Sequence, residues 1–149
     1  TRQEGIRQIG GKKGSKRHVL VEGRGVPLSV VVTGANVHDV KMLAQVLDGM
    51  VIEQPEPVGL PNLCADNGYR GAGSEQTIMA HDYCPHIRGR GEEQSEKKEG
   101  YRARRWVVEA CHSWHNRFRK LLTRFEKQSK NYLALLQFAC ALICWRKVI

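Results

Sequence analysis

Two runs of β-forming residues near the start of the sequence constrain the fold most strongly: residues 17–23 (RHVLVEG) and 26–34 (VPLSVVVTG). Glycines flank Arg24 between the runs, a composition that favours the tight turn of a β-hairpin. Pro27 stands at the start of the second run, where a strand accepts proline. Because that run is almost continuously apolar, it predicts a strand covered on both faces.

The next part of the chain alternates helical and strand patterns. Asp39 is predicted to cap a helix over about residues 40–50. A short strand over 62–66 (NLCAD), a helix over about 73–81 and a last strand over 83–87 (YCPHI) follow. This order predicts an α/β fold with a mixed sheet flanked by helices.

Two helices are predicted to close the chain, with a break near residues 129–131. The second, YLALLQFACALICW over residues 132–145, is too short to span a bilayer and is apolar on nearly all sides. It is therefore expected in the middle of the core. Residues 1–16 are predicted to form a flexible basic arm, residues 17–149 the folded domain, and residues 89–103 a mobile linker within it.

Charge is distributed unevenly along the chain, whose net charge is +9. Residues 1–25 carry seven cations and two acids, and residues 101–130 carry nine cations and two acids. Residues 26–100 carry six cations and eleven acids. Such basic segments are typical of a polyanion partner, DNA or RNA first, although a solvated charged face is the simpler reading.

The five cysteines have no paired spacing, and no signal-peptide pattern is present, so a reducing cytoplasm is the expected compartment. Cys111, His112 and His115 are residue types that bind metal. Without a Cys-x-x-Cys pair nearby, however, a zinc site is not favoured. Four other histidines receive no assigned role from the sequence: His18, His38, His81 and His86.

Two carboxylates stand out by position. Asp66 ends a short strand before a glycine turn, where α/β sheets gather ligand-binding groups, and where an aspartate also commonly bonds its own backbone. Glu109 lies in the predicted helix RRWVVEACHSWHNRFRKLLTRFEK over residues 104–127. A helical wheel places Trp106, Ala110, Trp114, Phe118, Leu121 and Phe125 on the buried side of that helix, and Glu109 at the head of a polar stripe.

Together these residues suggest a metal-dependent site. A strand-end aspartate and a helical glutamate meeting in a cleft bind divalent metal through hard oxygen ligands. Two such metals support in-line phosphoryl displacement. The surrounding lysines and arginines then hold nucleic-acid phosphates. The simpler reading of Glu109 is a charge partner for the start of the helix.

Four ordered blocks between Lys12 and Arg146 resemble the bacterial insertion-sequence transposases of families four and five, which are DDE enzymes with an RNase H-like catalytic domain. The blocks are KGSKRHVLVEGRGVPLSVVVTGANVHD, NLCADNGYRG, RRWVVEACHSWHNRFRKLLTRFEK and NYLALLQFACALICWR. The resemblance implies metal-dependent cleavage and strand transfer of DNA with two Mg²⁺ ions, or Mn²⁺ in their place. It makes Asp66 and Glu109 catalytic metal ligands, with Gly68 and Tyr69 in the turn beyond the aspartate.

The resemblance also implies DNA, both element ends and target, as the partner of a nucleoid-associated bacterial protein. It implies no membrane partner, and it allows a homodimer in the DNA complex. Arg105 matches the arginine of the family signature and is expected to contact DNA. Four further cations on the same predicted helix are expected to do so as well: Arg104, Arg117, Lys120 and Lys127.

Several positions depart from the family pattern. The first catalytic aspartate would precede Thr1, so the fold is expected to lack its first strand and the chain to be the C-terminal part of a truncated transposase. Asp39 and Glu22 are not assigned to the missing role. Asn67 and Asn116 stand where some members have a basic residue, and Ala110-Cys111 replace the usual Arg-Thr. Two alternatives remain: a non-catalytic DNA-binding remnant, and a misfolding-prone fragment with an unpaired strand edge.

Overall fold

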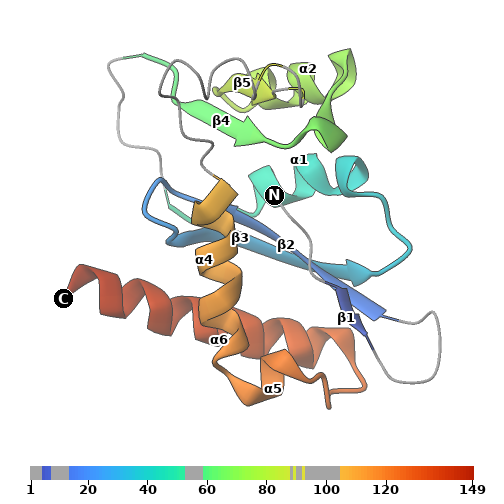
Figure 1. Cartoon of the computed structure of the whole chain (residues 1–149), viewed down its shortest axis with the longest axis vertical. Helices are drawn as coiled ribbons and strands as arrows, with labels where there is room; N and C mark the ends of the chain where they lie inside the picture. The colour runs from blue at the N-terminus through green and yellow to red at the C-terminus, as the bar shows by residue number, and fades with distance from the viewer. Residues whose placement is uncertain (1–4, 8–13, 53–58, 88, 90–91, 93–104) are drawn as a thin grey trace.

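The computed structural model describes residues 5–7, 14–52, 59–87, 89, 92 and 105–149. The described strands are β1 (Gly5–Arg7), β2 (Gly14–Val21), β3 (Pro27–Gly34), β4 (Asn62–Ala65) and β5 (Cys84–Ile87). Two 3-10 helices are present, η1 (Asp39–Met42) and η2 (Asn67–Tyr69). The α-helices are α1 (Leu43–Asp48), α2 (Ala72–Ala80), α4 (Arg105–Asn116), α5 (Arg119–Leu122) and α6 (Ser129–Val148). The chain is thus α/β, as predicted (Figure 1).

The predicted hairpin is confirmed: β2 and β3 pair antiparallel. In its turn, the Gly25 amide donates to the Glu22 carbonyl at 2.8 Å, and the Glu22 amide donates to the Val26 carbonyl at 2.9 Å. The Glu22 carboxylate accepts from the Arg24 amide at 2.8 Å and holds the turn from its side chain. Local sequence therefore specifies this turn completely.

Helices cover both faces of the hairpin, as its apolar second strand predicted. Val30 and Val32 of β3 pack against a core cluster formed by Leu121, Tyr132, Leu136 and Ala139 of α5 and α6. On the other face, Leu20 of β2 packs against the cluster that contains Leu43 and Leu47 of α1. In Figure 1, α1 and α6 accordingly lie on opposite sides of the hairpin.

A second, smaller unit of sheet carries Asp66. Strands β4 and β5 pair parallel, with Leu63 opposite Pro85, and α2 connects them. Leu63, Tyr69, Ile78 and Tyr83 from this region join α1 in one core cluster. The short strands and the helix following Asp66 therefore lie where the sequence placed them.

The strands form two separate sheets among the described residues, with orders β1-β2-β3 and β4-β5. The single mixed sheet expected from the element order is not present among them. Residues 5–7 and 14–16, inside the segment expected to be a flexible arm, form strand. Nearly all of the linker expected over residues 89–103 lies outside the described residues.

Asp39 does not cap the helix that follows it. The N-cap of η1 is His38, whose side chain makes no capping hydrogen bond. The Asp39 carboxylate instead accepts from Lys16 Nζ at 3.3 Å. An ion pair with a residue 23 positions away thus replaces the local capping bond.

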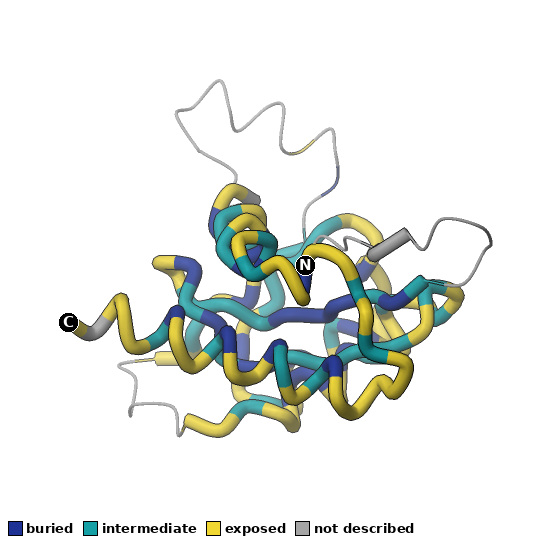
Figure 2. Tube along the Cα trace, turned by 90° about the horizontal axis from the view of Figure 1, so that it is seen from below, coloured by how far each residue is buried: buried dark blue, intermediate teal, exposed yellow. Residues whose placement is uncertain are grey.

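The last helix is not the centre of the core, which corrects the sequence expectation. Along α6 buried and exposed residues alternate (Figure 2), with Tyr132 and Leu136 fully buried. Phe138 is 64% exposed and Trp145 is 67% exposed. Helix α6 lies on the side of the hairpin away from α1 (Figure 1), and one of its sides packs against β3. None of the described helices is long and apolar enough to cross a lipid bilayer.

Candidate functional site

Asp66 lies at the carboxyl end of β4, as predicted, and is half-buried. It caps η2: its Oδ1 accepts a hydrogen bond from the Gly68 amide at 3.0 Å. The turn-forming reading of this aspartate is therefore correct in geometry. That bond occupies one carboxylate oxygen, which orients the side chain while leaving its other oxygen for a different ligand.

Glu109 lies in the first half of α4 and is exposed. The buried side of the helix is formed by Val107, Cys111 and His115, whereas Trp106 is 57% exposed. The predicted buried stripe is therefore wrong at Trp106 and Phe125 but correct at Leu121, which is fully buried. The orientation of α4 follows from its partners, because Asn116 accepts a 2.8 Å hydrogen bond from the buried Arg17 of β2.

The single predicted helix over residues 104–127 is also interrupted. Helix α4 ends at Asn116, and the short α5 begins at Arg119. The chain is extended at Phe118 and at Thr123, and α6 starts at Ser129. The polar stripe drawn on one continuous wheel therefore does not exist as a single surface.

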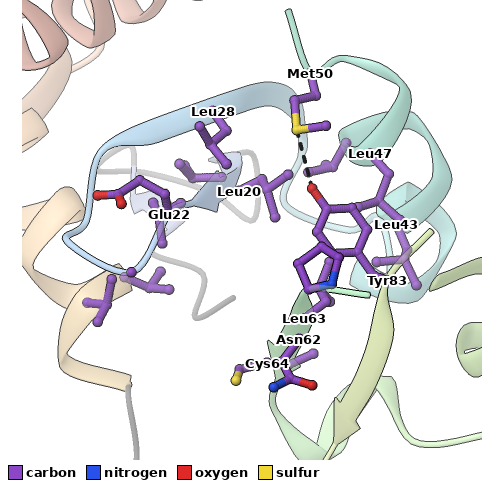
Figure 3. A pocket seen from close by; sticks show the side chains of 18 of the residues that line it. Leu20, Glu22, Leu28, Leu43, Leu47, Met50, Asn62, Leu63, Cys64 and Tyr83 are labelled. Atoms are coloured by element: carbon purple, nitrogen blue, oxygen red, sulfur yellow. Dashed lines mark hydrogen bonds between the residues drawn. The ribbon is translucent and has the colours of Figure 1, made fainter. Parts of the chain in front are cut away.

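A cavity of about 410 Å³ lies between β2 and β4, and we call it the central cavity. Its walls come from the hairpin, α1, β4 and the start of α4 (Figure 3). Ala65 and Val108 are among its lining residues, and they directly precede Asp66 and Glu109 in the sequence. Each predicted acid thus follows a residue that lines this cavity, although neither acid is itself among the lining residues.

Most side chains around the central cavity are aliphatic, as those labelled Leu20, Leu28, Leu43 and Leu47 illustrate (Figure 3). Glu22 is the carboxylate among the lining residues. Its side-chain oxygens accept from the Arg24 amide at 2.8 Å and the Val26 amide at 3.4 Å. Glu22 thus holds the hairpin turn with its side chain.

The described residues contain no group of three or more His, Cys, Asp and Glu side chains that could hold a metal ion. Of the predicted DNA contacts, Arg117, Lys120 and Lys127 are exposed. Arg104 lies outside the described residues. Arg105 begins α4, and its side chain is not among those described.

Comparison with known proteins decides the family. The family described as Transposase DDE domain matches residues 2–144, nearly the whole chain. A protein named as a transposase for insertion sequence element IS402, from Burkholderia cepacia, is 34% identical over 143 residues. The chain belongs to the DDE transposase domain family. The matched region is 90% of this chain but 64% of that relative, so the chain spans less than two thirds of the relative's length. No solved structure matches the chain.

Sequence reasoning missed the buried polar contact between α4 and its neighbours in this transposase domain. His115 is fully buried, and its Nε2 lies 3.2 Å from Cys140 Sγ of α6. Burial lowers the pKa of His115 to about 3 and raises the pKa of Cys140 to about 12. Both groups are therefore neutral near pH 7, which suits a structural contact between helices.

Two of the unassigned histidines have structural contacts. His18 is buried, with Nε2 2.7 Å from Thr33 Oγ1, and burial lowers its pKa. His81 ends α2: Nδ1 is 2.7 Å from the Thr77 carbonyl and Nε2 is 2.9 Å from Asp48. The hydrogen bond to Thr77, followed by that to Asp48, raises the pKa of His81. His38 and His86 still have no role.

Proposed function

We propose that the protein to which this chain belongs is a DNA transposase that cleaves DNA and transfers the cut strand, with Asp66 and Glu109 as metal ligands. The observation that carries the proposal is the central cavity, whose lining residues Ala65 and Val108 immediately precede those two acids. Membership of the DDE transposase domain family supports the reaction class. Neither acid is among the residues that line the cavity, so the proposal takes their neighbours Ala65 and Val108 as the link to it.

An RNase H-like fold is part of the proposal, and the central cavity is where its remaining strand would fit. Strand β1 pairs with β2 only at Gly14, Ser15 and Lys16. Beyond those residues, the described part of the chain gives this edge of β2 no neighbour, and β4 pairs only with β5. A strand from outside these 149 residues, lying between β2 and β4, would satisfy both edges and join the two sheets.

That strand would also supply the third carboxylate. Carboxylate oxygens are the donors that Mg²⁺ prefers, with Mn²⁺ accepted by similar sites, so Asp66 and Glu109 fit the ion in their chemistry. Bound between the acids, a metal pair would stabilise the charge that develops on the attacking and leaving oxygens of the phosphodiester. The backbone amide of Gly68 fixes the Asp66 side chain for this task.

The basic residues complete the proposal by holding DNA phosphates. Arg117, Lys120 and Lys127 are exposed along α4, α5 and the segment after them. Arg104 and Arg105 belong to the same set from sequence resemblance. Phosphate contacts of this kind position the duplex without reading its sequence. A homodimer in the DNA complex stays a prediction.

The proposal is tested with the full-length gene product, after the genomic DNA upstream of the Thr1 codon has been read for a strand that carries an aspartate. Asp66→Asn and Glu109→Gln are expected to lower Mg²⁺-dependent strand transfer by about three orders of magnitude or more, because charge stabilisation supplies several kcal/mol. Glu75→Gln, the same change on α2, is the matched control and should retain activity. Full activity of Glu109→Gln would refute the assignment of that residue.

A non-catalytic DNA-binding remnant is the competing function, and one observation favours it: the described residues alone make no metal site. The remnant would bind DNA with a steep salt dependence and no response to Mg²⁺. Fluorescence anisotropy of a labelled duplex, titrated with NaCl at constant Mg²⁺ and then with Mg²⁺ at constant ionic strength, separates the two. A frameshift or stop codon upstream of Thr1 would favour the remnant.

A further inference from the structure

A second cavity lies near the C-terminal end of α4, whereas the central cavity borders its start, and we call it the α4–α6 pocket. It encloses about 350 Å³. Its lining residues come from the end of α4 and from α6: Trp114, Arg117, Phe118, Leu142, Ile143, Arg146 and Lys147. Three of these seven residues are cations, and no acid is among them. The pocket thus joins apolar and aromatic side chains with charge of one sign, positive.

The composition of the pocket narrows the chemistry of its ligand. A bare phosphate would not need the apolar walls, and a purely apolar ligand would not need three cations. A ligand with an unsubstituted ring face and a phosphate uses both. A nucleotide meets this description only when its base is unpaired, because pairing keeps both base faces stacked in the duplex.

We propose that the α4–α6 pocket binds an unpaired nucleotide of a DNA strand, with the base against Trp114 and the phosphate on Arg146 and Lys147. This inference rests on the proposed function for the choice of DNA, and it adds a site that the metal-binding acids do not include. Arg146 and Lys147 are both exposed, and Lys147 Nζ lies 4.4 Å from the Trp114 ring centroid. Binding exchanges this cation–ring contact for base stacking and a phosphate contact.

The pocket's position suits a strand that also passes the acids. Trp114 follows Glu109 by five residues on α4, which is a rise of about 7.5 Å along the helix axis. The same interval is a rotation of about 140° around the axis, so the pocket and Glu109 face different directions. A strand leaving the duplex near Glu109 would therefore reach the pocket by bending around α4.

The first experiment measures binding of a short oligothymidylate and of an abasic phosphodiester of equal length, without metal. Stacking of one base predicts about 5- to 100-fold tighter binding of the oligothymidylate. Arg146→Ala and Lys147→Ala should each weaken oligothymidylate binding several-fold and lower the salt slope by about 0.7. Lys130→Ala is the matched control, because Lys130 is an exposed cation near the other end of α6.

The second experiment reports on the pocket directly. In a Trp106→Phe, Trp145→Phe background, both replaced side chains being exposed, Trp114 is the remaining tryptophan. Its fluorescence should be quenched by oligothymidylate and unchanged by the abasic chain. Quenching together with the Arg146 and Lys147 effects supports the site.

Other outcomes overturn the proposal in distinguishable ways. If the two oligomers bind equally tightly, the pocket contacts only phosphate, and the proposed stacking of a base is refuted. If Arg146→Ala and Lys147→Ala leave oligothymidylate binding unchanged, the DNA binds elsewhere on the chain, and the assignment to this pocket is refuted. Binding of neither oligomer, nor of a duplex, would remove both the pocket and the DNA partner of this chain.

Discussion

The central cavity and the α4–α6 pocket have similar volumes, about 410 and 350 Å³, but opposite linings. Aliphatic side chains dominate the first, and three cations surround the second. The first lies between β2 and β4, and the unpaired backbone N–H and C=O groups of a strand edge can accept another strand. The second lies between helices, whose backbone N–H and C=O groups bond to each other within the helix. Only side chains are therefore available to a ligand.

This difference explains how one small domain offers two kinds of recognition. A cavity beside strand edges offers backbone hydrogen-bonding groups and apolar side chains, so it suits a polypeptide segment. A side-chain pocket with one sign of charge selects for an anion. The segregation is visible in the sequence as well, since the cationic pocket is built entirely from residues beyond 113, while the acidic middle of the chain contributes to the central cavity.

The largest expected effect is a loss of stability, and it compares a leucine from the lining of each cavity. Leu63, which is 7% exposed, lines the central cavity and belongs to a core cluster, whereas Leu142 of the α4–α6 pocket is 36% exposed. Leu63→Ala should lower the free energy of unfolding by about 2–4 kcal/mol, through lost burial and an enlarged void. Leu142→Ala, the matched change, should cost less than about 1 kcal/mol. Urea unfolding measures both, and equal losses would contradict the contrast.

An intermediate effect uses pH, because the buried His115 of α4 and the partly exposed His81 after α2 respond with opposite sign. Burial lowers the pKa of His115 to about 3, so below its ordinary value of 6.5 only the unfolded chain takes up this proton. Stability should therefore fall as pH decreases from about 6.5, by about 1.4 kcal/mol per pH unit. Urea unfolding of the parent chain and His115→Gln at about pH 7.5 and 5.5 measures this, and the variant should lack that part of the acid loss.

His81, near α1, provides the opposite case. Its hydrogen bonds to Thr77 and Asp48 raise its pKa, so its stabilising contribution is complete below pH 6.5 and is lost as pH rises through the folded value. His81→Gln should therefore cost more stability at about pH 5.5 than at about pH 8. The effect is smaller than for His115 because both bonds lie near the surface. The same sign of pH dependence in both variants would refute the assignments.

Sequence predicted those features whose determinants are close in the chain. The hairpin turn is built by Glu22, Arg24, Gly25 and Val26 on one another, and Asp66 bonds an amide two residues away. These interactions require no distant partner. Short-range residue chemistry therefore placed the strand carrying Asp66 and the turn after it correctly.

The failed predictions all depend on distant partners. Apolar residues occur on two sides of α4, and the side that is buried follows from Arg17, 99 positions from Asn116. Asp39 pairs with Lys16 instead of capping the helix, and α6 is half-exposed because one of its sides packs against β3. Periodicity alone does not contain this information.

The last prediction concerns the hairpin turn, which approaches one lining residue of each cavity. Gly25 has a φ of +86°, and a Cβ there would lie 3.1 Å from the Val107 carbonyl oxygen and 3.2 Å from the Trp114 ring. Val107 lines the central cavity and Trp114 lines the α4–α6 pocket. Gly25→Ala should therefore lower the free energy of unfolding by about 1–2 kcal/mol, from backbone strain and from displaced α4 contacts.

Gly23→Ala in the same turn is the matched control, because a Cβ at Gly23 meets nothing within 4 Å. Its unfolding free energy should stay within about 0.5 kcal/mol of the parent value. If Trp114 forms the base-binding wall, Gly25→Ala should also weaken oligothymidylate binding, while Gly23→Ala should not. Loss of stability without loss of binding would show that the hairpin turn supports α4 but does not set the position of Trp114. The two cavities would then be independent, each organised at its own end of α4.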